Sequence, residues 1–309
     1  MSTFIKTKED LDSRKSAYRE SLRKYKYKVL VCGGAGCLSS NCAEVQVALK
    51  ECLKKNNLEE DVCLLETGCI GSCAVGPLIV IEPENVLYTN VTPSMAWEIL
   101  ESHIISGHVI EEYTFYDLAL NKNVARIDDI TFFKEQTKIA LKNCGTIDHG
   151  SIDAYIAANG YQAIYQALQG SREDVVKVVK DSGLRGRGGG GFPTGIKWEA
   201  ALKVESDQKY MVCNADEGDP GAFMDRSLLE GDPHGIIEGM MIGGYAMVPV
   251  WAMSMCVPSI LWPWSAWGEP LIRPGRQAFW VREFWAVILI STWKSELALA
   301  PLSAVRKQR

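Results

Sequence analysis

The sequence predicts an α/β fold made of two successive regions. Its 309 residues are enough chain for two domains, at roughly 100–200 residues per domain. A hydrophobic share of 47% beside 23% charged residues excludes an intrinsically disordered chain. The apolar pattern then divides the chain: strands and helices follow one another in the first region, whereas the second begins with short helices and a glycine-rich loop.

The first region combines an amino-terminal helix, within residues 1–26, with an α/β domain over residues 27–112. Ser39 or Ser40 is the expected N-cap of the helix after the first strand, and Thr92, which precedes a proline, is that of the last helix. The expected strands are 27–31, 62–66, 78–81 and 86–91. The expected helices are 8–23, one through Val45, Leu49 and Leu53, and one through Trp97, Leu100 and Ile104.

A weaker pattern over residues 113–146 predicts a linker or an extended connection between the two regions. The second region begins beyond it, at residues 147–246. Three short helical patterns, a glycine-rich segment and a strand are expected there, in the order 151–159, 161–168, 172–181, 182–198 and 210–213.

Charge and cysteine usage narrow the class of protein. Lys and Arg number 33 and Asp and Glu 38, a net charge of −5, and no basic block is long enough to predict a nucleic-acid partner. The first residues are charged where a signal peptide needs an apolar core, which predicts a cytoplasmic protein. Ten cysteines in such a chain indicate metal binding or redox chemistry rather than disulfides.

Four cysteines have the spacing of a metal–thiolate site. Cys32 and Cys37 follow one expected strand, and Cys69 and Cys73 follow the next, each pair in a glycine-rich turn. Such turns let the main chain approach bound sulfur atoms closely. Four thiolates could hold either zinc or a [2Fe–2S] cluster, and the spacing alone does not choose between them. The remaining cysteines considered are interpreted as small core residues: Cys42, Cys52, Cys63, Cys144 and Cys213.

The two cysteine pairs and the Gly68–Pro77 segment around the second pair resemble the thioredoxin-like [2Fe–2S] ferredoxins. These include the small iron–sulfur subunit of respiratory complex I and the amino-terminal domains of related hydrogenase subunits. The resemblance covers about residues 28–110. It implies a thioredoxin-like fold and a [2Fe–2S] cluster, rather than zinc, on Cys32, Cys37, Cys69 and Cys73.

The glycine-rich segment predicts a site for an anion. Gly186, Gly188 and Gly191 satisfy the dinucleotide-binding pattern, but they follow a helical segment rather than a strand, so that match is weak. Bare backbone amides with Arg185, Arg187 and Lys197 nearby fit a phosphate cradle better. After the next strand, Asn214, Asp216 and Glu217 are suited either to hydrogen bonds with a cofactor or to an Asx-type turn.

Segments 182–198 and 213–225 resemble the NADH-oxidising flavoprotein subunit of complex I, in its hydrogenase and formate dehydrogenase branch. The resemblance runs from about residue 139 to 246. It implies the start of an atypical Rossmann-like domain that holds FMN and NADH. Gly186, Gly188, Lys197, Asn214 and Asp216 would then face FMN, Phe192 would stack near the nicotinamide, and Glu217 and Asp219 would lie on the NADH side. The full cofactor-binding set adds Arg187, Gly189, Gly190, Gly191 and Gly195.

Residues 247–309 depart from this family. Residues 239–268 contain no charge and are long enough to span a membrane, but three prolines disfavour that alternative. The codons of residues 251–260 and 300–309 can also be translated in the frame that begins at the third base of each codon. With suitable synonymous codons, this frame gives the segments that the family has at these places. We therefore expect an out-of-frame tail and no membrane span.

The resemblance implies an NAD(P)H-oxidising electron-transfer subunit. Hydride would pass to FMN, and single electrons would then pass to iron–sulfur clusters, with no side chain acting as an acid or base. Its partners would be a small iron–sulfur subunit and a catalytic hydrogenase or formate dehydrogenase subunit. A [4Fe–4S] cluster is expected only after frame correction. The alternative is a stand-alone [2Fe–2S] ferredoxin-like carrier with an inert second region.

Overall fold

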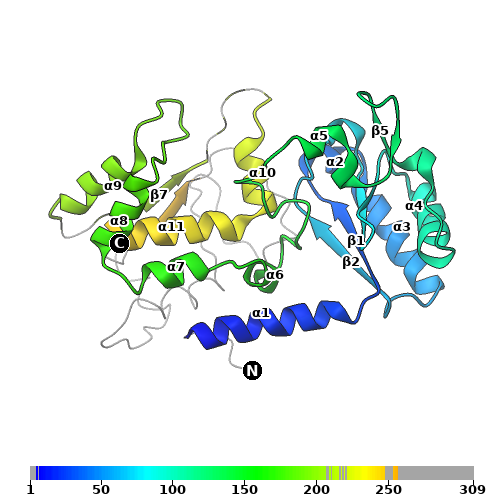
Figure 1. Cartoon of the computed structure of the whole chain (residues 1–309), viewed down its shortest axis with the longest axis horizontal. Helices are drawn as coiled ribbons and strands as arrows, with labels where there is room; N and C mark the ends of the chain where they lie inside the picture. Colours follow the sequence, from blue (N-terminus) through cyan, green and yellow to red (C-terminus); the bar gives the residue numbers. More distant parts are fainter. Residues whose placement is uncertain are drawn as a thin grey trace, which may run out of the picture.

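The computed structural model describes residues 5, 7–206, 209, 211–215, 217, 219, 221–247 and 253–256. Figure 1 shows a sheet-containing part on one side and a helical part around α11 on the other, with α1 running beneath the helical part. The two regions expected from the sequence are therefore both present.

A four-stranded sheet forms the centre of the first part. Its strands are β1 (Tyr27–Cys32), β2 (Val62–Thr67), β3 (Ile79–Glu82) and β4 (Val86–Tyr88). They lie in the order β2-β1-β3-β4, with β1 and β2 parallel and the other neighbours antiparallel. The strand positions agree with the predicted ones within a few residues, and the α/β prediction is confirmed.

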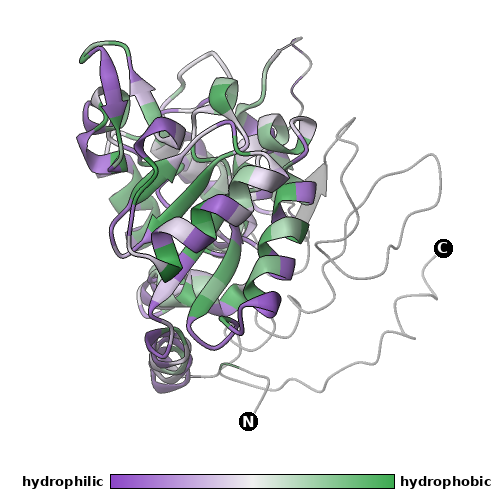
Figure 2. Cartoon of the chain, turned by 90° about the vertical axis from the view of Figure 1, so that its right-hand side faces the viewer, coloured by the Kyte–Doolittle hydropathy of each residue, from purple (hydrophilic) through white to green (hydrophobic). Residues whose placement is uncertain are grey.

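Helices cover one face of this sheet. They are α3 (Cys42–Lys55) and α4 (Pro93–Ile99), which continues as η2 (Leu100–Ile105). Their apolar side chains share a core with the strands, because residues such as Val29, Leu49 and Ile99 are fully buried together. Figure 2 shows green, hydrophobic strands beside helices along which hydrophilic and hydrophobic residues alternate.

The predicted helix caps are correct for α4 and wrong for α3. Thr92 caps α4 as predicted, since its hydroxyl accepts a hydrogen bond from the Met95 backbone N–H at 3.3 Å. The prediction for α3 was wrong: the N-cap is Asn41, not Ser39 or Ser40. Asn41 has a φ of 64°, a left-handed conformation that asparagine tolerates better than most residues. Ser39 instead ends a short helix, α2 (Ala35–Ser39).

The segment over residues 113–146 is neither the linker nor the extended connection that the sequence predicted. It follows η3 (Glu111–Tyr113) and contains β5 (Phe115–Asp117), β6 (Lys122–Val124), η4 (Ile127–Asp129) and α5 (Thr131–Lys134). The Leu87 backbone N–H donates to the Ala125 carbonyl at 2.8 Å, and Val124 and Ile130 pack on the second face of the sheet. These contacts join residues that are distant in sequence, so no local periodicity reveals them.

The second part is mainly helical. Its elements are α6 (Ile152–Ala157), α7 (Gln162–Ala167), α8 (Arg172–Asp181), α9 (Thr194–Lys203), β7 (Met211–Asn214), α10 (Met224–Gly231) and α11 (Pro233–Met247). The apolar side of α11 is central, because it contacts both the α6–α7 side chains and those of α8 and α9.

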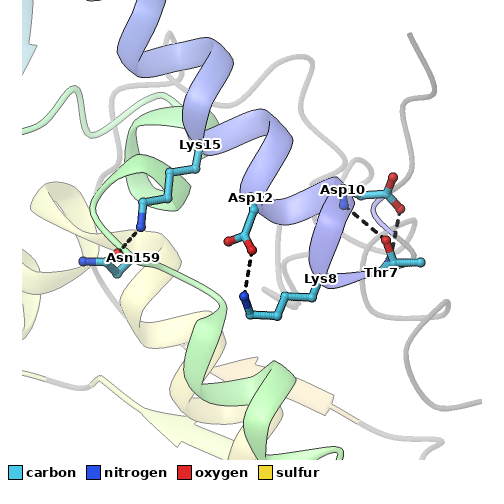
Figure 3. A network of polar contacts seen from close by, with 6 residues as sticks. All are labelled: Thr7, Lys8, Asp10, Asp12, Lys15 and Asn159. Carbon is cyan, nitrogen blue, oxygen red and sulfur yellow. Dashed lines mark hydrogen bonds and ion pairs between the residues drawn. The ribbon is translucent and has the colours of Figure 1, made fainter.

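The amino-terminal helix α1 (Lys8–Arg23) packs against the second part, although it precedes the first in sequence. Leu11 is buried among side chains of α6 and α11. Arg14 forms an ion pair with Asp153 at 2.9 Å, and Lys15 donates to the Asn159 side chain at 2.5 Å (Figure 3). The capping box at Thr7, drawn in the same figure, begins the helix. The amino terminus therefore connects the two parts.

One strand lies inside the segment for which we expected no native structure. It is β8 (Met253–Cys256), which pairs in parallel with β7, Met211 opposite Met253. The remainder of the expected out-of-frame tail, from residue 257, lies outside the described residues. Of the helices that the structure describes, none combines the length and the apolarity that a membrane crossing requires.

A buried carboxylate organises the core of the second part. Glu238 on α11 is only 6% exposed and accepts hydrogen bonds from the Tyr155 hydroxyl at 2.5 Å and from the backbone N–H groups of Tyr161 and Ile164 at 2.8 and 3.1 Å. It thus satisfies the first turn of α7. Beside it, burial lowers the pKa of His234 to about 4, and its Nδ1 lies 2.9 Å from the Tyr161 hydroxyl.

Replacing Glu238 with alanine should destabilise the second part by about 3 kcal/mol, because it leaves three buried donors without an acceptor. Urea unfolding followed by circular dichroism measures this loss. The control is E20Q on α1, which removes only an exposed ion pair with Arg23 and should change stability by less than about 1 kcal/mol. Equal midpoints for E238A and E20Q would contradict the role given to Glu238.

Candidate functional site

The sheet topology brings the two cysteine pairs together. Cys32 ends β1, Cys37 lies in α2, Cys69 follows β2, and Cys73 begins η1 (Cys73–Val75). Because β1 and β2 are parallel neighbours, the loops after them leave the sheet at the same edge. Four cysteines from two distant stretches of chain therefore meet at one place.

The four sulfur atoms form a continuous series of contacts. Cys69 Sγ lies 3.5 Å from Cys73 Sγ, and the Cys32 thiol interacts with both Cys37 and Cys69. Cys32 and Cys37 are buried, Cys69 is half-buried and Cys73 is exposed. Among the described residues, no three His, Cys, Asp or Glu side chains converge on a single ion position. The thiol side chains therefore contact one another in the sequence Cys37, Cys32, Cys69 and Cys73.

Glycines make room for these sulfur atoms. A Cβ on Gly34 would lie 3.2 Å from Cys69 Sγ, and one on Gly36 3.3 Å from Cys73 Sγ. A Cβ on Gly76 would lie only 2.8 Å from Cys37 Sγ. Larger side chains at these places would displace the cysteines. The donor set and its glycine surroundings fit a thiolate-bound iron–sulfur cluster.

The thiols differ in how readily they lose their protons. The hydrogen bond between the Cys32 and Cys37 side chains lowers the pKa of Cys37 and raises the pKa of Cys32 to about 11. The hydrogen bond with Cys32 raises the pKa of Cys69, and burial raises that of Cys73. A metal centre needs all four as thiolates, so its assembly releases protons and becomes harder as pH falls.

The other cysteines only partly match the interpretation as core residues. Cys42, Cys52 and Cys144 are fully buried, as predicted. Cys63 and Cys213 are half-buried. The prediction from the sequence was therefore correct for the first three and too strong for the last two.

The glycine-rich loop between α8 and α9 is closed at its base and open at its tip. The Gly186 backbone N–H donates to the Phe192 carbonyl at 2.8 Å, and that of Thr194 to the Leu184 carbonyl at 2.8 Å. Gly189 and Gly191 have φ angles of 91° and 59°, which favour glycine. In Figure 1 the loop projects away from the helices. Its exposed amides remain accessible to an anion.

Apolar side chains around this loop are also exposed. Phe192, predicted to stack near a nicotinamide, is 58% exposed, and Val212 on β7 and Phe223 before α10 are 56% and 58% exposed. Their exposed apolar surface is available for contact with a ligand or with another segment of the protein.

Two predicted cofactor residues have structural roles here. Gly195 is buried, and a Cβ there would overlap the Lys180 Cα, so this glycine allows α9 to pack on α8. Glu217 accepts hydrogen bonds from the backbone N–H groups of Asp225 and Arg226 at 2.8 and 3.0 Å and thereby caps α10.

The structure brings the remaining predicted residues into no common pocket within the part of the chain that it describes. Arg187, Gly188, Gly190, Lys197, Asn214 and Asp219 are exposed, and Asp216 lies outside the described residues. The assignment of cofactor contacts to these positions stays a prediction.

Sequence reasoning missed the contacts that join the Cys69 loop to residues 138–145 and to the second part. The Gly145 backbone N–H donates to Thr67 Oγ1 at 2.9 Å, and Lys138 Nζ donates to the Ile70 carbonyl at 2.9 Å. Gly68 packs against Gly231 so closely that a Cβ on Gly68 would overlap the facing Cα. Partners so far apart in sequence leave no local signal.

Two family models match separate parts of the chain. The thioredoxin-like [2Fe-2S] ferredoxin model matches residues 18–103, and the Nuo51 FMN-binding domain model matches residues 179–254. The fold and the two matches thus define a chain of the α/β class with two successive domains. More particularly, the chain has an amino-terminal thioredoxin-like [2Fe–2S] ferredoxin domain followed by the start of a Nuo51 FMN-binding domain.

Curated relatives are oxidoreductase subunits. The NADP-reducing hydrogenase subunit HndC of Solidesulfovibrio fructosivorans is 62% identical over 114 residues, which cover 37% of this chain and 23% of the relative. The alpha subunit of the NAD-reducing hydrogenase HoxS of Cupriavidus necator is 34% identical over 184 residues, 60% of this chain and 28% of the relative.

A subunit of the NADH-quinone oxidoreductase of Escherichia coli is 48% identical over 98 residues, 31% of this chain and 22% of the relative. The chain thus spans about a quarter of the length of these relatives. Among solved structures, a thioredoxin-like [2Fe-2S] ferredoxin from Aquifex aeolicus is 28% identical, covering 29% of this chain and 89% of that chain, with a TM-score of 0.27.

Proposed function

We propose that this chain belongs to a cytoplasmic, NAD(P)H-oxidising subunit of a multisubunit hydrogenase, formate dehydrogenase or complex I-like enzyme. The convergence of Cys32, Cys37, Cys69 and Cys73 supports this most strongly, because a cluster on these cysteines would put a one-electron site in the same chain as the match to an FMN-binding domain. These four cysteines would ligate the [2Fe–2S] cluster.

The protein's contribution is binding, orientation and electrostatics. Bound FMN would accept hydride from the nicotinamide cofactor and release electrons one at a time to iron–sulfur centres. The amides of residues 187–191 and the charges of Arg187 and Lys197 would hold phosphate groups. Phe192, already exposed beside the loop, would cover a flat ring system.

The partners would be other redox subunits: a small iron–sulfur subunit and a catalytic hydrogenase or formate dehydrogenase subunit. The named relatives support a hydrogenase or quinone-reductase setting. A [4Fe–4S] cluster would require the frame-corrected tail. A stand-alone ferredoxin-like carrier is the second candidate, supported by the convergence of all four cysteines while most of the predicted flavin-binding residues are exposed.

Adding NADH or NADPH anaerobically to the frame-corrected protein should bleach its flavin absorbance and produce the electron paramagnetic resonance signal of a reduced [2Fe–2S] cluster. Comparing the two nucleotides at equal concentration identifies the preferred one. A protein that carries flavin but responds to neither nucleotide would contradict the proposal. A cluster that dithionite reduces but neither nucleotide reduces, in a protein without flavin, would instead favour the stand-alone carrier.

A further inference from the structure

A lysine from the supposed linker reaches the loop that carries Cys69. Lys138 Nζ donates to the carbonyl of Ile70, the residue directly after Cys69, at 2.9 Å. The same ammonium lies 5.5 Å from the centroid of the Phe133 ring. Lys138 is half-buried, so both contacts restrain its side chain. A positive charge is therefore fixed beside the peptide that joins Ile70 to Gly71, between Cys69 and Cys73 in the same loop.

The surroundings of this peptide hold it in place. Thr67 at the end of β2 is fully buried and accepts the Gly145 N–H, and the backbone of Gly68 packs against Gly231. Burial raises the pKa of the Cys144 thiol, and the nearby Lys138 ammonium partly opposes this shift. The distance between the ammonium and the cysteine loop is thus set by the junction of the two parts.

We propose that Lys138 is a positioning residue that raises the reduction potential of the iron–sulfur cluster. This inference rests on the proposed ligation by Cys69. One-electron reduction adds one negative charge to the cluster and its thiolates. A nearby cation in a partly desolvated site stabilises that added charge more than it would in water. Hydrogen bonds and charges around the sulfur atoms are established determinants of cluster potentials.

The test is a redox titration of the full chain with dithionite as the electron donor, followed by the electron paramagnetic resonance signal of the reduced cluster. K138Q keeps a hydrogen-bond donor but removes the charge, and its potential should shift to a more negative value. K138R keeps the charge and should remain close to the unmodified protein. K203Q, which removes an exposed charge at the end of α9, should cause no shift.

Each other outcome has a definite meaning. An unshifted potential in K138Q, with its cluster intact, would overturn the role of the charge. If K138Q loses the cluster, the potential is measured in K138M, which retains most of the aliphatic part of the side chain. Loss of the cluster in both variants would show that Lys138 is needed only to maintain the structure, and would overturn the inference. Iron-free unmodified protein after anaerobic reconstitution would instead refute the ligation itself, which separates failure of the proposed function from failure of this inference.

Discussion

Replacing Cys69 with alanine should remove most of the iron and the visible absorbance of the protein. Cys69 lies in the middle of the sulfur contact series, between Cys32 and Cys73, so its loss separates the two pairs. C69S should retain a weaker, altered signal, because a serine oxygen is a poorer ligand for iron than a thiolate sulfur. Iron content and the electron paramagnetic resonance spectrum after dithionite reduction measure both effects.

Cys63 provides the matched control. It lies on β2, is half-buried and does not belong to the quartet. C63A should keep the iron content and the spectrum of the unmodified protein. If C69A retained its full spectrum, or if C63A lost its own, the assignment of the cluster to these four cysteines would be wrong.

The second large effect concerns flavin. The chain of 309 residues, expressed as written, should keep its iron–sulfur cluster but purify with little or no FMN and show no NADH-dependent dye reduction. A pocket holds its ligand by burying most of the ligand's surface. Phe192, Val212 and Phe223 are each more than half exposed, and the opposite side of the pocket is expected in the out-of-frame tail, so a bound ring would stay largely in water.

A frame-corrected gene should restore both properties. We expect resequencing to find one base gained or lost near codon 247, and the corrected chain to continue beyond residue 309 with further cysteines. Flavin per cluster, measured side by side in the two proteins, is the comparison. Equal, near-stoichiometric FMN in both would mean that the cofactor is misplaced or the tail misread, and an unaltered base sequence would remove the sequencing-error explanation.

The cysteine site could be predicted from the sequence because its determinants are local. Each pair follows its own strand in its own glycine-rich turn. The parallel pairing of β1 and β2 then brings the two turns together at the same end of the strands. The junction could not be predicted in this way. Lys138 and Ile70 meet only because residues 113–146 fold back along the sheet, which a weak apolar pattern had suggested to be a linker.

The flavin loop shows the limit of transferring roles from a resemblance. The loop's place between α8 and α9 follows from its glycines, whose left-handed conformations few other residues adopt. Yet Gly195 serves helix packing and Glu217 caps α10. A motif identifies which residues belong together, whereas packing and capping depend on neighbours that the motif does not contain.

The most direct test of the central claim is the metal and sulfide content of the unmodified chain after anaerobic purification. Four cysteines that hold a [2Fe–2S] cluster predict iron and acid-labile sulfide in equal amounts, both lost in C69A, and no stoichiometric zinc. Stoichiometric zinc without iron or sulfide would show that the same four thiolates form a zinc site, and would contradict the account of this chain as an electron-transfer protein.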